Sequence, residues 1–197
     1  MNEVIANYLA QHYATLNIVS RSAGCVSELA LKEGKSVPSS PLIYQETLEG
    51  VQLCDIDADY KKLVPQSTEK GILFFESVKG STARKESSRM LRWTGYLNLV
   101  FWANTKKIGE NHSLVSLQSQ IMQHLPDEIP GNALGFLKGR VHTAREMPKD
   151  YNPFAKYNFD DPAYQVSPYL YFVYEIRYEA LTTRNCNTAL ILNPSEC

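Results

Sequence analysis

Hydrophobic positions recur with two different periods along the chain, and each period predicts one kind of element. Apolar residues at three- and four-residue steps predict a helix over about 4–16. The same spacing predicts a second helix over 113–124, with Ser113 as its N-cap. Pro126 ends this helix, because the residue before a proline is pushed out of helical geometry.

Alternation of apolar and polar residues predicts strands over 72–78, 91–103, 136–144 and 169–181. The second of these alternates most clearly, and Gly95 inside it indicates a bulge or the close packing of another element. One face of the alternating strands should therefore lie on the core. The core that we expect contains large apolar side chains from two strands and one helix: Trp93, Leu97, Leu99, Phe101, Leu117, Ile121, Phe172 and Ile176.

Two stretches show neither period. Residues 17–70 contain Gly and Pro at short intervals, which predicts an irregular segment. Residues 145–168 are polar and contain four prolines, and a loop of this length is usually functional, so we expect an arm that reaches a neighbouring subunit. We therefore predict a single α+β domain over 1–197. Its antiparallel-dominated sheet should have about four or more strands, with two helices packed on one face and extended loops or arms.

The composition narrows the range of functions. The chain has 20 Lys and Arg against 21 Asp and Glu, which excludes a dedicated polybasic nucleic-acid binder and an acidic disordered tail protein. No apolar run approaches the roughly 20 residues of a membrane helix, so we expect no membrane partner. The four cysteines are far apart and form no CxxC pair, which favours free thiols in a reducing compartment over a disulfide scaffold or a zinc site.

No catalytic or cofactor motif is convincing in the sequence. His142 and Glu146 have the four-residue spacing of a helical metal pair, but we predict a strand leading into a loop there, which favours an ordinary surface pair. We therefore expect no catalytic residue, no metal and no cofactor.

Charge is more informative than motifs. The segment 79–92 holds one acid and five basic residues, a net charge of +4, and the basic residues are Lys79, Arg84, Lys85, Arg89 and Arg92. The segment 46–59 holds no base and five acids: Glu46, Glu49, Asp55, Asp57 and Asp59. The plain interpretation is two solvated loops. Two functional interpretations stay open: the segments dock head to tail between subunits, or the basic segment contacts the phosphates of passing DNA.

The order of elements provides a further indication. A strand over 96–103 ends in an aromatic residue and a turn, and a short amphipathic helix, another strand and a long Asp- and Pro-containing loop follow. The closing strand, 170–178, ends in the acidic–apolar–basic–aromatic pattern Glu175-Ile176-Arg177-Tyr178. Over about 70–181, together with the first helix, this order resembles the tail-terminator and tail-completion (neck) proteins of long-tailed bacteriophages.

The resemblance implies a structural virion subunit rather than an enzyme. Such a subunit is made in the cytoplasm of the host bacterium and forms a homo-oligomeric ring, commonly a hexamer, at the head–tail junction. The ring caps the tail tube and joins it to the connector, and the basic residues above would line a subunit interface or a DNA channel. The alternatives are a neck adaptor or head-completion subunit and, less favoured, a small enzyme that binds a phosphorylated substrate through Arg84, Lys85 and Arg89.

Overall fold

The computed structural model describes residues 1–26, 42–43, 61–62, 67–109, 112–131, 138–148, 150–153 and 166–183. The elements in chain order are α1 (Asn2–Tyr13), β1 (Arg21–Cys25), β2 (Leu42–Ile43), β3 (Lys61–Lys62), β4 (Gly71–Lys85), β5 (Met90–Asn104), α2 (Thr105–Ile108), α3 (Leu114–Gln123), β6 (Glu128–Pro130), β7 (Lys138–Glu146) and β8 (Tyr169–Thr183). The acidic segment 46–59 lies outside the described residues, and so does most of the arm predicted over 145–168.

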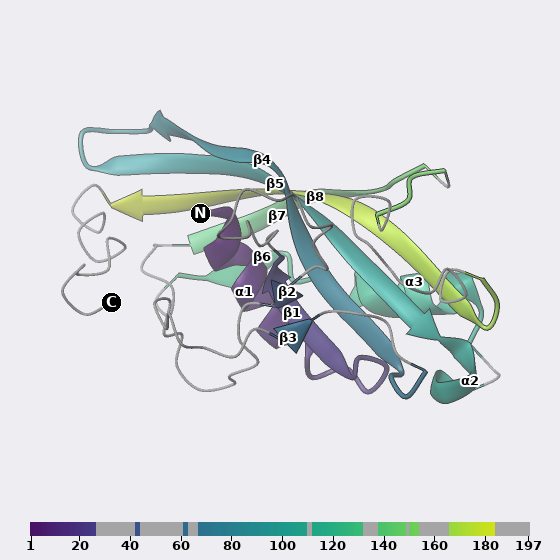
Figure 1. The fold of residues 1–197 in the computed structure, drawn as a ribbon. Coiled ribbons are helices and arrows are strands. Elements are labelled where there is room, and N and C mark those ends of the chain that lie inside the picture. The colour runs from purple at the N-terminus through teal and green to yellow at the C-terminus, as the bar shows by residue number, and fades with distance from the viewer. Residues whose placement is uncertain are drawn as a thin grey trace, which may run out of the picture.

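A curled six-stranded sheet with the order β1-β4-β5-β8-β7-β6 forms the centre of the fold (Figure 1). β1 runs parallel to β4, whereas the other neighbouring strands run antiparallel. The sheet is therefore mixed, which corrects the expected antiparallel-dominated sheet but remains compatible with an α+β fold. The correction arises from β1, because its sequence Arg-Ser-Ala-Gly-Cys shows no apolar alternation from which a strand could be predicted.

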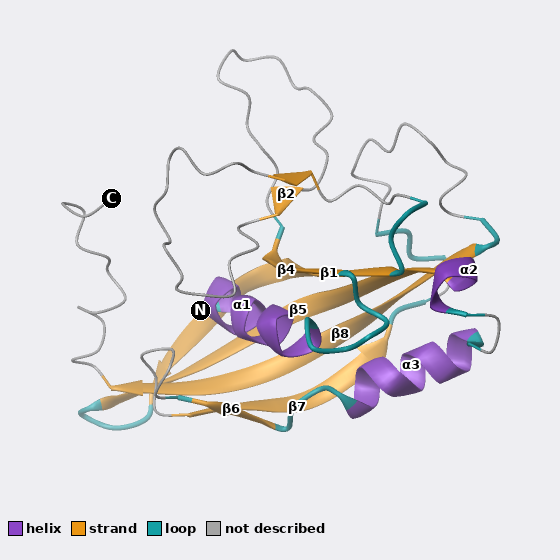
Figure 2. Ribbon diagram, turned by 90° about the horizontal axis from the view of Figure 1, so that it is seen from below, coloured by secondary structure: helices purple, strands orange, loops and turns teal. Residues whose placement is uncertain are grey.

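Large apolar side chains from the sheet and from α1 and α3 share one buried cluster. We call this side of the sheet the helix face, and Figure 2 shows both helices in front of it. The hydroxyl of Tyr13 on α1 donates to the carbonyl of Ile121 on α3 at 2.9 Å, which joins the two helices beneath the sheet. The helix predicted over 113–124 is confirmed as α3, and the Ser113 side chain caps it by accepting from the Ser116 amide at 3.2 Å.

The predicted core is confirmed at seven of its eight positions. Leu97, Leu99, Phe101, Leu117, Ile121 and Ile176 are fully buried, and Phe172 is 5% exposed. Trp93 is only half-buried and packs at the margin of the cluster, where its indole N–H donates to the Thr182 hydroxyl at 3.0 Å.

A second, smaller cluster lies on the opposite side of the sheet, which we call the second face. It contains Ile72, Phe74, Val100, Trp102 and Val173 together with Ala23 of β1. Strand β5 is flanked by β4 and β8 and is buried on both faces from Leu97 to Asn104. This position explains why its sequence is almost continuously apolar there, as is typical of a strand inside a sheet that is covered on both sides.

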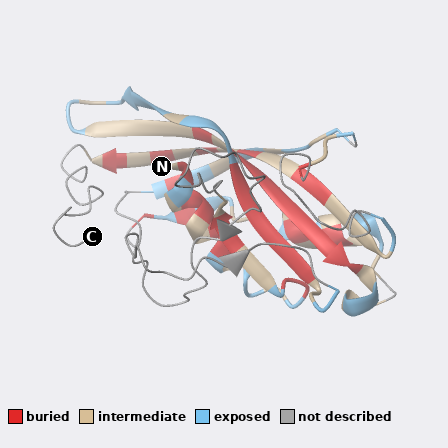
Figure 3. Ribbon diagram, viewed as in Figure 1, coloured by how far each residue is buried: buried red, intermediate tan, exposed pale blue. Residues whose placement is uncertain are grey.

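Strands β4 and β5 continue outward as a hairpin beyond the apolar body (Figure 1). The sequence predicted a strand only over 72–78, with a solvated loop as the plain interpretation of 79–92, but β4 remains paired with β5 as far as Lys85. The prediction was wrong because the polar sequence indicates exposure, whereas the strand is held by backbone hydrogen bonds to its neighbour. Figure 3 shows the change from buried to exposed along β4, which follows Glu76.

The first turn of α1 is attached to the root of this hairpin. The Asn2 amide donates to the Ser77 hydroxyl at 2.6 Å and to the Lys79 carbonyl at 2.8 Å, and its oxygen accepts from the Tyr178 hydroxyl. Gly95 lies next to this contact between Asn2 and Tyr178, because a Cβ at Gly95 would come within 2.3 Å of the Tyr178 oxygen. The close packing expected at Gly95 is thus confirmed, because only a residue without a side chain leaves room for this contact.

Two histidines connect the C-terminal ends of α1 and α3. The ring Nε2–H of His12 donates to the His124 carbonyl at 3.0 Å, and the ring Nε2–H of His124 donates to the His12 carbonyl at the same distance. The two rings stack with their centres 4.3 Å apart. Burial, with a smaller contribution from the charge of His124, lowers the pKa of His12.

Candidate functional site

The basic residues predicted from the sequence fall into two groups in the structure. Lys79, Arg84 and Lys85 are exposed on the outer part of β4, and Arg89 is exposed in the turn that joins β4 to β5. The ammonium of Lys79 lies 4.0 Å from the centre of the Tyr96 ring, a cation–π contact on the same hairpin. These four residues therefore lie on one projecting hairpin, where Arg84 and Lys85, as consecutive residues of β4, point to opposite faces. Their role at a subunit interface or a DNA channel stays a prediction.

Arg92 behaves differently from the other four, because two carboxylates hold it. Its guanidinium donates to both oxygens of Glu86, at 3.0 and 2.9 Å, and to Glu179 on β8 at 2.7 Å. The hydrogen bond from Arg92 lowers the pKa of Glu86, and the two carboxylates raise the pKa of Arg92. Arg92 is thus fixed in place within its own subunit rather than available as a free cation.

Glu179 is the centre of a charged group on the second face. Its carboxylate receives Arg92, the Arg177 guanidinium at 2.9 Å and the ring nitrogen of His142 at 3.3 Å. The hydrogen bond from Arg92 contributes most to lowering the pKa of Glu179, and the nearby charge of His142 acts in the same direction. A single ionised carboxylate therefore orients nitrogen-bearing side chains from three neighbouring strands.

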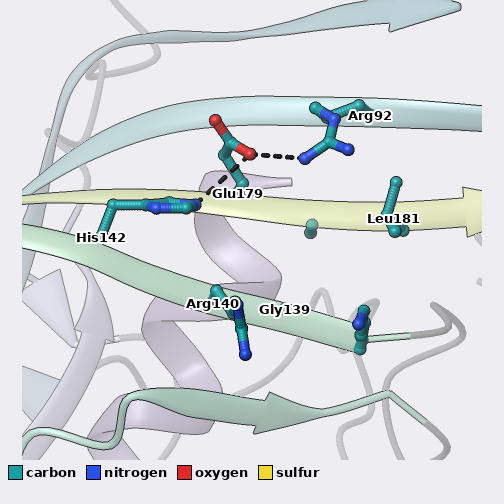
Figure 4. Close-up of a pocket in the computed structure, with 8 residues that line it drawn as sticks. Arg92, Gly139, Arg140, His142, Glu179 and Leu181 are labelled. Carbon is teal, nitrogen blue, oxygen red and sulfur yellow. Dashed lines mark hydrogen bonds and ion pairs between the residues drawn. The ribbon is translucent and has the colours of Figure 1, made fainter. Parts of the chain in front are cut away.

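A shallow hollow of about 260 Å³ lies beside Glu179, between β5, β8 and β7. Figure 4 shows Arg92 and His142 directed at the Glu179 carboxylate and Arg140 on the neighbouring strand. The hollow is lined by Arg92, Lys138, Gly139, Arg140, His142, Glu179, Ala180 and Leu181. None of these described lining residues carries a hydroxyl or thiol, so the hollow offers basic side chains around one carboxylate but no side chain of those nucleophilic types.

The basic residues of β7 were missed in the sequence. Lys138 and Arg140 alternate along the strand, and Arg145 faces the same side after an irregularity in register between Val141 and Thr143. The alternation of basic side chains on a predicted strand was the available signal, and it was overlooked because the window has a smaller excess of positive charge than 79–92.

The possible metal pair His142 and Glu146 does not form. His142 contacts Glu179 on the second face, whereas Glu146 accepts a hydrogen bond from Gln118 of α3 at 2.7 Å. Among the side chains that the structure describes, no three His, Cys, Asp or Glu residues lie close enough to share a metal ion. None of the described helices is both long and apolar enough to cross a bilayer.

The five acidic residues predicted to contact the basic hairpin are Glu46, Glu49, Asp55, Asp57 and Asp59, and all of them lie outside the described residues. Their docking to another subunit therefore stays a prediction. Comparison with protein-family models and with curated protein sequences finds no match for this chain.

Proposed function

We propose that this protein is an assembly subunit that forms a homo-oligomeric ring, in the form of a hexamer, at the head–tail junction of a long-tailed bacteriophage. In this role it caps the tail tube and joins it to the connector as a tail-terminator or tail-completion protein. The proposal rests on the order of elements in the sequence, and the mixed sheet with α1 and α3 against its helix face is compatible with it.

The projecting β4–β5 hairpin is the observation that supports this function most directly. Residues Ser77–Gly80 and Thr82–Lys85 of β4 are exposed, so this part of the strand contributes little apolar burial to its own subunit. Beyond Phe75, no described strand pairs with the outer edge of β4. An ordered arm that does little for the stability of the monomer is suited to contact a neighbouring subunit.

The charge of the hairpin favours a directional contact over general adhesion. After Arg92 is neutralised by its two carboxylates, Lys85 and Arg89 still have no ion pair with any described residue. A basic surface of this kind repels its own copy on a neighbouring subunit and attracts an acidic one, so it selects a head-to-tail arrangement.

Assembly can be tested by reversing three charges together, Arg84→Glu, Lys85→Glu and Arg89→Glu. All three side chains are exposed, so the fold should survive, while the proportion of ring in native mass spectra should fall strongly, and most at low salt, where the reversed charges are least screened. The control is Lys106→Glu with Lys107→Glu on α2, which reverses two exposed lysines on a different element.

A second set of reversals separates the two possible partners of the hairpin. If the acidic segment 46–59 is the partner, then Glu46→Lys, Asp55→Lys and Asp57→Lys should restore part of the ring in the reversed hairpin. If DNA is the partner, they should not restore it. A wild-type protein that stays monomeric at all concentrations, alone and with tail-tube subunits, would overturn the proposed function.

A further inference from the structure

We propose that the β7 side of the second face, at the hollow beside Glu179, binds the phosphate backbone of double-stranded nucleic acid. This surface, which we call the β7 cationic row, consists of Lys138, Arg140 and Arg145, with His142 between them. It is distinct from the exposed basic residues of the hairpin, although Arg92 of the segment 79–92 also lines the hollow, and all of its residues belong to one chain. The inference therefore goes beyond the proposed function and does not depend on ring formation.

The geometry of the β7 cationic row suits a regular polyanion. Two residues along a strand span about 6.6 Å, so Lys138 and Arg140 extend from the same face of the sheet as neighbouring positive charges. Register pairs Arg140 with Glu179 and Arg145 with Glu175, which places both basic residues on the second face. The regular part of the strand holds Lys138 and Arg140 side by side, and Arg145 returns to the same face after the irregularity in register that follows Val141.

Two acids near the β7 cationic row orient its basic side chains, but the row keeps a net positive charge. Glu128 receives the Arg140 guanidinium at 2.7 Å, and Glu175 receives Arg145 at 2.9 Å. Both arginines remain widely exposed, with 59% and 72% of the side chain accessible, so a phosphate can reach them. Lys138 is exposed and lines the hollow without an ion pair to any described acid.

Nucleic acid fits this surface better than an acidic polypeptide does. The hollow is shallow and lies on an extended sheet, and its described lining combines basic side chains with one glycine, one alanine and one leucine. A peptide loses chain entropy when it becomes ordered on such a surface, whereas a duplex arrives with its charges already in a fixed array.

Binding can be measured by fluorescence anisotropy with a labelled 25-base-pair DNA duplex of mixed sequence at several salt concentrations. If Lys138, Arg140 and Arg145 each neutralise one phosphate, the plot of log K against log salt should have a slope of about −2.7. Affinity should then fall about 20-fold between 50 and 150 mM salt. The double variant Lys138→Gln with Arg140→Gln should reduce the slope to about −0.9, which corresponds to a loss of only about 3-fold.

The matched control is Lys106→Gln with Lys107→Gln, which removes the same charge from α2 and should leave the slope unchanged. Glu128→Gln should instead strengthen binding, because it releases Arg140 and removes a negative charge beside the row. Thermal melting of each variant checks that it is folded.

Three results would overturn the inference: no binding of the wild-type protein at 50 mM salt, equal slopes for the two double variants, or displacement of the duplex by polyglutamate at equal charge concentration. Each can occur whether or not the protein forms a ring in native mass spectra, so failure of this inference is distinguishable from failure of the proposed function.

Discussion

The contact between α1 and the root of the hairpin can be tested by the change Asn2→Ala. Asn2 is 7% exposed, and its side chain donates two hydrogen bonds and accepts a third from Tyr178. Each hydrogen bond contributes about 0.5–1.5 kcal/mol, and a buried hydroxyl that loses its acceptor costs about 1–3 kcal/mol. We therefore expect the free energy of unfolding in urea to fall by about 2–4 kcal/mol.

The same variant should loosen the hairpin more than the body of the sheet. Hydrogen exchange should accelerate at amides of Ser77–Lys85, with a smaller change at Leu99. Asn17→Ala is the matched control, because Asn17 is exposed and its loss should change stability by less than about 0.5 kcal/mol. A loss below about 0.5 kcal/mol for Asn2→Ala, or unchanged exchange in the hairpin, would refute the idea that α1 holds the hairpin at its root.

Three further outcomes follow from the packing. Leu99→Ala, at a fully buried position of β5, should lower the free energy of unfolding by about 2–5 kcal/mol in urea titrations, and a loss under 1 kcal/mol would contradict the assigned core. Because the pKa of His12 is lowered on folding, the unfolded chain takes up a proton more readily; stability should fall as the pH drops below about 6.5, and His12→Gln should flatten this profile. Burial raises the pKa of Cys25 to about 12, so mass spectrometry should find Cys25 unmodified by iodoacetamide at pH 8 in native protein and modified in urea.

The spacing of apolar residues predicted some strands of this protein well and missed others, and the distribution of charge predicted the surface only in part. The strands with strong alternation, β5 and β8, appear within one or two residues of their expected ends, because one face of each must be buried. β1 and the outer half of β4 were not predicted, because both are held by backbone pairing with a neighbouring strand. Such pairing does not require a particular spacing of apolar residues, so the sequence pattern does not reveal it. A sequence read segment by segment cannot supply information about neighbouring strands.

The candidate site illustrates the same limit. The excess of basic residues over 79–92 correctly indicated an exposed surface, but it could not show that Arg92 is neutralised by an acid from β8. Likewise, Lys138 and Glu179 lie far apart in sequence and line one hollow only because β7 pairs with β8. The net charge of a sequence segment depends only on the residues within it, whereas the ion pairs of each side chain depend on which strands become neighbours in the sheet.

The position of β8 in the sheet affects how the chain can be synthesised and folded. β8 is the last described strand in the sequence, yet it lies between β5 and β7 and pairs with β5 at every position from Met90 to Asn104. The β4–β5 hairpin needs only a short turn and can form early, whereas the β5–β8 ladder must close over residues 105–168. Until residue 183 has left the ribosome, the edges of β5 and β7 that β8 covers remain unpaired. A chain that stops before β8 would therefore expose two strand edges that are prone to aggregation, rather than merely lack an edge strand.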